Sequence, residues 1–199
     1  MTEKLLIDVP LEIETGRLTI RSPRRGDGPL LFEAIRDSRD RLAPWFPWTN
    51  NHRTPEESEA FIWRKHIDFL ARTDMLLLLF LKGTGTLIGS SGLHYPDWSV
   101  PSFEIGYWVR SGYEGNGYIT EAVRGITDIA FNNLDARRVV IRCDVKNEKS
   151  AAVARRAGFE LEGTHRCISR HHRTNQLRDL LVFARIRRDP SVEDWPADG

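Results

Sequence analysis

Cysteine and long apolar runs are scarce in this sequence of 199 residues. The two cysteines, Cys143 and Cys167, lack the CxxC spacing of a redox or zinc site, so we expect both to be reduced packing residues. The longest apolar run, from Met75 to Leu81, is far shorter than the ~20 residues that a membrane helix needs. We therefore expect neither a disulfide framework nor a membrane span, and the apolar run predicts a buried strand.

An excess of charge and a targeting signal are also lacking. The sequence has 29 Lys and Arg residues against 28 Asp and Glu residues, and the formal net charge of +1 gives no overall attraction to nucleic acid or membranes. The N-terminal letters MTEKLLIDVPLEIETGR lack the charged-then-apolar pattern of a signal peptide, so we expect a cytoplasmic protein. The six histidines form no pair at metal-ligand spacing, and no metal site is expected.

One α/β domain is expected over residues 1–186, followed by a polar C-terminal tail over 187–199. No internal repeat, low-complexity tract or Pro/Ser-rich linker divides the chain. The mixture of strand and helix patterns predicts a mixed, largely antiparallel central sheet flanked by helices. Strands are expected at 17–21, 75–81, 86–93, 103–109, 138–145, 159–162, 166–170 and 177–185, and helices at 26–41, 54–71, 120–133 and 147–157.

Capping residues mark two of the helix starts. The letters TPEE from Thr54 match a capping box with proline at the first helical position. Asn147 is a suitable N-cap for a short helix, and Gly158 stands where a left-handed residue commonly ends one. These signals predict helices that begin directly after Thr54 and Asn147.

The most informative stretch is FEIGYWVRSGYEGNGYITEA, from Phe103 to Ala122. A strand runs into a glycine-rich turn that opens a helix, so backbone N–H groups and the positive end of the helix dipole converge on one point. Gly115 and Gly117 let the backbone approach an anion closely, and Thr120 adds a hydroxyl donor. The pattern predicts a phosphate-binding loop, although glycine pairs also make ordinary turns, and it lacks the further residues of a Walker loop or dinucleotide fingerprint.

Three motifs in this order resemble a known family. The runs EIGYWV, EGNGYITEA and VKNEKSAAVARRAGFELEG are similar to the GNAT superfamily of acetyl-coenzyme A dependent N-acetyltransferases, and within it to the RimJ/RimL type that acetylates ribosomal-protein N-termini. The resemblance extends from about Glu14 to about Phe183. It implies a GNAT-like fold, acetyl-CoA as cosubstrate and a homodimer.

The resemblance also implies how coenzyme A binds. The family's pyrophosphate motif, Gln/Arg-x-x-Gly-x-Gly/Ala, falls on Glu114, Gly117 and Ile119, so only the central glycine matches. Backbone N–H groups still supply most phosphate contacts in such a loop. Backbone groups of Trp108 and Val109 pair with the pantetheine arm, and one of their N–H groups faces the oxyanion. The expected cofactor-binding residues are Trp108, Val109, Glu114, Gly115, Asn116, Gly117, Tyr118, Ile119, Thr120, Asn147 and Ser150.

Two residues are candidates for catalysis. An amine must lose a proton before it attacks a thioester, and Glu104 is the expected base, acting directly or through water. Its sequence neighbours are apolar or aromatic, surroundings that make a carboxylate a stronger base, whereas the alternative is a solvent-facing strand residue. Ser150, in the family pattern Asn-x-x-Ser, is expected to hydrogen-bond or protonate the departing thiolate. The alternative is that Asn147 is an ordinary helix cap and Ser150 an ordinary residue of the first turn.

The acceptor is expected to be the N-terminal α-amine of a protein or peptide, because the resemblance is to the ribosomal-protein branch. Trp45 and Trp48, with a predicted turn at His94 and Tyr95, are candidate walls of the acceptor groove, although core packing explains the aromatics equally well. Acetylation of a polyamine, amino acid or antibiotic is one alternative, and a noncatalytic acyl-CoA-binding module is another. Nucleic-acid binding by the basic segment 166–178 is a third, but this segment is more typical of a solvated hairpin.

Overall fold

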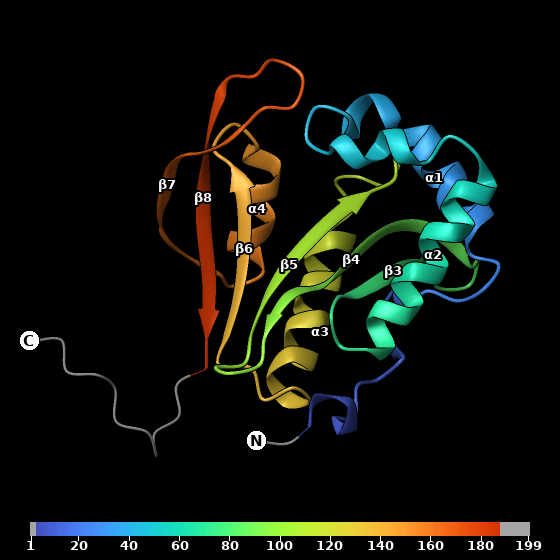
Figure 1. Ribbon diagram of the computed structural model, residues 1–199, viewed down its shortest axis with the longest axis horizontal. Coiled ribbons are helices and arrows are strands. Elements are labelled where there is room, and N and C mark those ends of the chain that lie inside the picture. The colour runs from blue at the N-terminus through green and yellow to red at the C-terminus, as the bar shows by residue number, and fades with distance from the viewer. Residues whose placement is uncertain (1–2, 188–199) are drawn as a thin grey trace, which may run out of the picture.

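The computed structural model describes residues 3–187 (Figure 1). All of the expected C-terminal tail except Arg187 lies outside these residues. The elements in chain order are η1 (Lys4–Leu6), β1 (Glu12–Glu14), β2 (Leu18–Arg21), α1 (Gly28–Leu42), η2 (Pro47–Asn51), α2 (Pro55–Leu70), β3 (Met75–Leu81), β4 (Thr86–Asp97), β5 (Ser102–Val109), α3 (Tyr118–Asn132), β6 (Arg138–Asp144), α4 (Glu148–Arg156), β7 (Glu160–Arg170) and β8 (Leu177–Ile186).

Eight strands form one sheet in the order β1-β2-β3-β4-β5-β6-β8-β7. The pair β5–β6 is parallel, and every other neighbouring pair is antiparallel. The predicted mixed, largely antiparallel sheet is therefore confirmed. The parallel pair needs a crossover, which α3 provides between the two strands (Figure 1).

Helices cover both faces of the sheet. The apolar run from Met75 to Leu81 forms β3, and all but its last residue are buried. Alternate β3 residues belong to two different apolar clusters, one with α3 and α4 and one with α1 and α2. A strand buried on both faces reads as a continuous apolar run, which explains this segment.

The predicted helix starts are confirmed by their caps. The Thr54 side chain accepts a hydrogen bond from the Glu57 N–H at 3.2 Å. Asn147 accepts one from the Ser150 N–H at 3.1 Å. Gly158 follows α4 with φ of 85°, the left-handed region in which glycine is favoured. Capping therefore fixes where Ser150 enters the first turn of α4.

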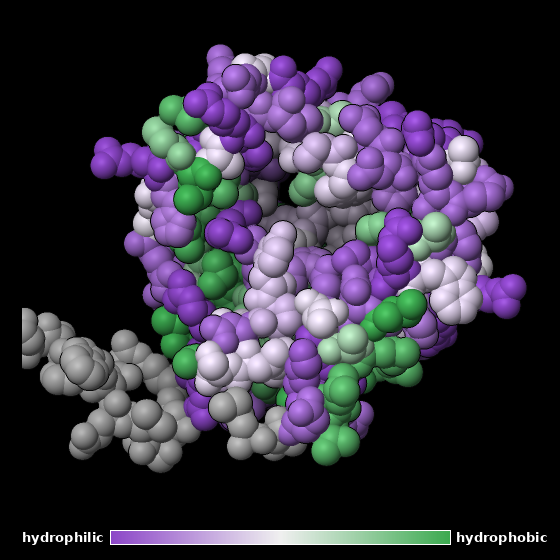
Figure 2. All heavy atoms as spheres, viewed as in Figure 1, coloured by the Kyte–Doolittle hydropathy of each residue, from purple (hydrophilic) through white to green (hydrophobic). Residues whose placement is uncertain are grey.

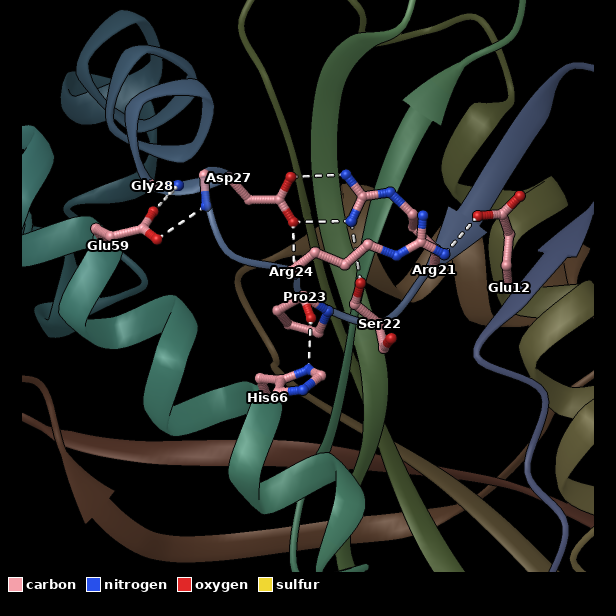
Figure 3. A network of polar contacts seen from close by, with 10 residues as sticks. Glu12, Arg21, Ser22, Pro23, Arg24, Asp27, Gly28, Glu59 and His66 are labelled. Carbon is pink, nitrogen blue, oxygen red and sulfur yellow. Dashed lines mark hydrogen bonds and ion pairs between the residues drawn. The ribbon is translucent and has the colours of Figure 1, made fainter.

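A polar network holds α1 and α2 to the sheet (Figure 3). Asp27, buried before α1, accepts two hydrogen bonds from the Arg21 guanidinium at 2.7 and 2.6 Å. Glu59 of α2 accepts from the backbone N–H groups of Gly26 and Gly28, both at 2.8 Å, at the start of α1. A Cβ on Gly28 would lie 2.5 Å from backbone atoms of Glu59, so only glycine permits this close helix contact.

Several boundaries differ from the prediction. His94 and Tyr95 lie within β4 and not in a turn, because β4 continues to Asp97 alongside β5. The two short strands predicted at 159–162 and 166–170 form the single strand β7, whose register shifts twice against β8. The short elements η1, β1 and η2 were not predicted, since three to five residues carry little periodicity.

The two cysteines have different environments. Cys143 is buried at the end of β6, as predicted. Cys167 is exposed on β7, so its predicted packing role is wrong. Its N–H donates to Asp179 at 2.8 Å, which holds the irregular part of β7 against β8. Among residues 3–187, no helix is long and apolar enough to cross a membrane.

Candidate active site

The site is built around a gap between β5 and β6. These strands pair only over Ser102–Glu104 and Arg138–Val140. Both strands continue past this point, β5 to Val109 and β6 to Asp144, and they diverge as they do (Figure 1). On its other edge, β6 pairs with β8 along its whole length. This pairing keeps β6 in line with β8, so β6 does not bend along with β5. The divergence leaves backbone groups of the second half of β5 without a strand partner on that side.

The free edge of β5 exposes particular N–H groups. The Arg110 N–H donates to the carbonyl of Ile88 in β4 at 2.7 Å. Alternate residues of a strand turn their backbone groups toward the same neighbour, so the Trp108 N–H also faces β4. The Val109 and Tyr107 N–H groups therefore face the gap. Of the two expected backbone donors, Val109 is the one directed at it.

Three hollows meet at the gap. The loop-side cleft, of about 510 Å³, is bounded by Val109, Ile119 and Ser150. The helix-side cavity, of about 410 Å³, lies beneath α1 and α2 and is lined by Trp48, His94 and Glu104, among others. The hairpin-side cavity, of about 350 Å³, lies between β5, β6 and β8. Phe46 and Tyr107 line all three, and Figure 2 shows the surface hollowed between the β7–β8 tip and the α1–η2 region.

The glycine loop has the geometry of an anion site. Gly115 and Gly117 adopt φ of 77° and 78°, and Gly117 is the N-cap of α3 without a side-chain cap. The first N–H groups of a helix have no partner within the helix, so they are available to an anion. Thr120, in the first turn, is 8% exposed and its hydroxyl has no hydrogen-bond partner among residues 3–187, but Thr120 and Gly117 line a separate hollow beside β1 and not the loop-side cleft. The N–H groups at the start of α3 fit a phosphate.

Two charged side chains lie at this loop. The Glu114 carboxylate is held by the Arg41 guanidinium at 2.8 Å and by the Gly112 N–H at 2.7 Å, so its charge is neutralised locally. Arg17 donates to the Asn116 carbonyl at 2.8 Å and lies 4.6 Å from the centre of the Tyr118 ring. The acidic departure from the family motif is therefore offset by Arg41. Arg17 is itself paired with the Glu121 carboxylate at 2.7 Å, so it holds the loop in place and adds no free charge.

Ser150 is tied to β5 across the gap. The Tyr107 hydroxyl donates to the Ser150 carbonyl at 2.9 Å, and the two hydroxyl oxygens are 3.0 Å apart. Burial raises the pKa of Tyr107, so its hydroxyl stays protonated near neutral pH. Ser150 lines both the loop-side cleft and the hairpin-side cavity. A hydroxyl pair thus stands where the two hollows join.

Glu104 lies on the opposite face of the sheet from Tyr107. Its predicted apolar surroundings are wrong, because side chains alternate along a strand and its sequence neighbours point to the α3 side. The carboxylate instead pairs with Arg142 of β6, whose Nε donates to Oε2 at 2.8 Å. This hydrogen bond raises the pKa of Arg142. The Oε1 atom of Glu104 has no partner among the described residues, and Glu104 lines both the helix-side and the hairpin-side cavity.

Opposite Glu104 in the β4–β5 register lies His94. Its Nδ1 atom is 2.5 Å from Oδ1 of Asp74, whose other oxygen is 2.7 Å from the Lys65 ammonium. Tyr95, the next residue, is 77% exposed at the rim of the two cavities. His94 therefore forms part of the inner wall of the helix-side cavity, and Tyr95 lies at the outer edge of both cavities.

The predicted aromatic residues have different positions. Trp48 packs in the helix-side cavity, with its ring 6.1 Å from that of Trp108 and 5.3 Å from that of Phe46. Trp45 lines the other two hollows. Behind Trp48, burial lowers the pKa of His52 to about 4, with the Arg39 charge adding to the effect, so this histidine is a neutral part of the wall.

The prediction missed Tyr107, Arg142 and Asp74, and the last two had a signal in the sequence. The predicted hairpin pairs Met75 with Leu93, which places Asp74 opposite His94. Strand parity places Arg142 on the same face as Glu104, provided that the parallel register is known.

Among residues 3–187, no group of three or more His, Cys, Asp or Glu side chains is placed to hold a metal ion.

Comparison with known proteins gives these features a context. Residues 17–160 match the acetyltransferase (GNAT) domain. The chain is 33% identical over 179 residues to YdaF of Bacillus subtilis (strain 168), whose name proposes a ribosomal N-acetyltransferase, and the match covers 86% of this chain and 92% of YdaF. It is 37% identical over 84 residues to the ribosomal-protein-serine acetyltransferase of Escherichia coli (strain K12), covering 42% of this chain and 45% of that protein.

Solved structures share the fold. RimL, a ribosomal L7/L12 alpha-N-protein acetyltransferase in complex with coenzyme A, matches with a TM-score of 0.80 at 22% identity, over 89% of this chain and 97% of that chain. At this identity the likeness establishes the fold alone. The domain match spans well over half of the chain, and YdaF is similar over nearly its whole length. The chain belongs to the GNAT family of acetyltransferases.

Proposed function

We propose that this acetyltransferase moves an acetyl group from acetyl-CoA to the N-terminal α-amine of a ribosomal protein. The observation that carries the proposal is the gap between β5 and β6, through which a hydroxyl on one face of the sheet and a carboxylate on the other reach a common space. Ser150 lines the loop-side cleft, Glu104 lines the cavities across the sheet, and Phe46 and Tyr107 border all three.

Acetyl-CoA is assigned to the loop-side cleft. The Gly115–Gly117 turn and the start of α3 would hold its pyrophosphate by backbone N–H groups. The free edge of β5 at Val109 would pair with the amides of the pantetheine arm, opposite Asn147. RimL, which shares the fold, was solved in complex with coenzyme A.

The chemical step divides between the two faces. The amine, once neutral, attacks the thioester carbon, and the Val109 N–H at the free edge of β5 is the donor best placed for the oxyanion. Glu104 attracts the acceptor ammonium and directs the loss of its proton, directly or through water. Ser150, hydrogen-bonded to Tyr107, gives a hydrogen bond or a proton to the departing thiolate. Both residues thereby touch reacting groups.

A peptide N-terminus suits the acceptor side. The helix-side and hairpin-side cavities share Glu104 and Tyr95 and are open to the surface, so an extended chain can enter with its amine first. Trp48 and Phe46 offer aromatic walls for the first side chain. Two relatives, YdaF and the Escherichia coli protein, carry names for acetylation of ribosomal proteins, which favours the same acceptor class.

The test is a panel of acceptors. The protein is incubated with acetyl-CoA and either N-terminal peptides of ribosomal proteins or small amines, and thiol release and product mass are recorded. We expect one additional acetyl group on the α-amine of a peptide. Acetylation of free polyamines, amino acids or antibiotics far in excess of every peptide would show that the acceptor is a small amine and not a protein N-terminus. Absence of thiol release with every acceptor would contradict the transfer itself.

A further inference from the structure

We propose that His94, oriented by Asp74, takes up the proton that the acceptor ammonium loses. The inference rests on the N-acetyl transfer proposed above and adds two residues to it. His94 is the residue that receives the proton, and Asp74 is a positioning residue that acts through it.

The hydrogen bond between these residues fixes the histidine tautomer. Nδ1 of His94 is 2.5 Å from Oδ1 of Asp74. A carboxylate only accepts, so Nδ1 carries the hydrogen, and Nε2 of the neutral ring presents a lone pair. Nε2 has no hydrogen-bond partner among residues 3–187, and the side chain lines the helix-side cavity. The ring is therefore prepared to accept a proton on the side that faces the cavity.

Asp74 is held in its ionised form by its partners. Burial alone would raise its pKa, but the hydrogen bonds and charges of His94 and Lys65 lower the pKa below its ordinary value. The Lys65 ammonium is 2.7 Å from Oδ2 of Asp74 and 2.9 Å from Asp68. An ionised carboxylate stabilises the imidazolium that forms when the ring accepts a proton, and it keeps the ring from rotating.

The position of the ring brings it to the acceptor. His94 is directly opposite Glu104 in the β4–β5 ladder, so the two side chains project from the same face of the sheet. Nε2 lies over Gly106, where a Cβ would be only 3.6 Å away, and the missing side chain keeps the space before the ring open. The titratable or charged groups around the ring are Asp74 before β3, Lys65 on α2, His52 after η2, Tyr95 on β4, Glu104 on β5 and Arg142 on β6.

The ion pair between Glu104 and Arg142 leaves uptake of the proton to His94. Oε2 of Glu104 is engaged by Arg142, so we assign Glu104 the attraction of the ammonium and assign the proton to the unpartnered Nε2 of His94. The ammonium N–H proton passes to Nε2 of His94, directly or through one water beside Glu104, and leaves a neutral amine and an imidazolium. The amine forms the new C–N bond and the thioester C–S bond breaks. The second amine proton ends on the departing thiolate, which leaves as the thiol, and the ring returns its proton to solvent before the next turnover.

The test measures kcat and kcat/KM against pH for three variants acting on one acceptor peptide. His94→Gln should lower kcat roughly a hundredfold and remove one inflection from the pH profile, with little change in the KM for acetyl-CoA. Asp74→Asn should lower kcat less and move that inflection to lower pH, because the imidazolium loses its anion. Asp68→Asn is the matched control, since it removes a carboxylate from the same Lys65 without touching His94. It should leave the profile unchanged.

Chemical rescue guards against a folding artefact. His94→Ala, checked by its thermal melting curve, should recover part of its turnover when imidazole is added, because the small base can occupy the vacated space. A His94→Gln enzyme with the wild-type profile and a kcat within twofold of wild type would overturn the inference while the transfer stands. Failure of the wild-type protein to acetylate any acceptor would instead contradict the proposed function.

Discussion

Two polar networks on the α1–α2 side of the sheet differ in whether they are closed. In the scaffold network, both oxygens of Asp27 are occupied by Arg21, and one also accepts from the Arg24 N–H (Figure 3). In the site network, Oε1 of Glu104 and Nε2 of His94 have no partner within residues 3–187 and border a cavity. A closed network can only stabilise the fold, whereas an open one has atoms left for a substrate. The comparison predicts that substitutions separate into losses of stability and losses of activity.

The largest effect is expected from opening the closed network. Asp27→Ala leaves the Arg21 guanidinium, only 14% exposed, without its anion, and should lower the free energy of unfolding by about 3–5 kcal/mol. Urea denaturation measures the loss. Glu12→Ala breaks the more exposed ion pair with Arg24 and should cost less than about 1 kcal/mol. Equal losses in the two variants would remove the distinction between buried and exposed parts of this network.

The next effect concerns the glycine loop. Gly117→Glu places a carboxylate at the start of α3, against the anion and the N-terminal N–H groups, and should weaken coenzyme A binding roughly a hundredfold or more, about 2.7 kcal/mol. Titration calorimetry measures it. Gly83→Glu is the matched control, because Gly83 has φ of 80° in the remote β3–β4 turn and nothing within 4 Å of its Cβ position. Undiminished affinity in Gly117→Glu would exclude the loop from the site.

A smaller effect is expected at the thiolate. Ser150→Ala removes one hydrogen bond to a leaving group that already departs readily, so kcat should fall roughly ten- to a hundredfold. The Ser150 N–H still donates to Asn147 in this variant, so α4 keeps its cap and its stability. Steady-state thiol release measures the rate. A wild-type kcat in Ser150→Ala would show that the Ser150 hydroxyl has no catalytic role and that the residue only contributes to the start of α4.

The smallest effect should follow removal of the Tyr107 hydroxyl. Tyr107→Phe keeps the ring that borders all three hollows and loses only the two contacts with Ser150, so kcat should fall roughly two- to tenfold. The same thiol-release assay compares it with Ser150→Ala. A double variant no slower than Ser150→Ala alone would show that the two hydroxyls act as one unit, and fully multiplied effects would show that they act independently.

Local signals in the sequence were enough for most elements. The capping letters after Thr54, the apolar run of β3 and the strand–loop–helix pattern around Gly117 each depend on residues close in the chain, and each was predicted. The continuity of β7 was not predicted, although two short strands within it were, because its register shifts follow from pairing with β8. Its side chains are nearly all exposed, so it lacks the alternation that marks a half-buried strand.

The partners of the site residues were harder to predict than the residues. Glu104 stood out in a conspicuous motif, but its ion pair with Arg142 depends on the parallel register of β5 and β6, which no local pattern encodes. Asp74 lies 20 residues before His94 and meets it through the β3–β4 ladder. Contacts between distant segments decide which polar groups are closed and which are open, so chemistry was less predictable than fold.

The most direct test of the account compares turnover and stability in Glu104→Gln. The variant keeps a side-chain oxygen that can accept a hydrogen bond from Arg142. Because the Glu104–Arg142 ion pair is partly exposed to solvent, the free energy of unfolding should change by less than about 1 kcal/mol. Turnover of an N-terminal peptide should fall roughly 10²- to 10⁴-fold, because the acceptor ammonium loses the carboxylate that directs its deprotonation, while coenzyme A binding stays intact. Wild-type turnover in Glu104→Gln, or a stability loss as large as that of Asp27→Ala, would contradict the assignment of chemistry to the open network.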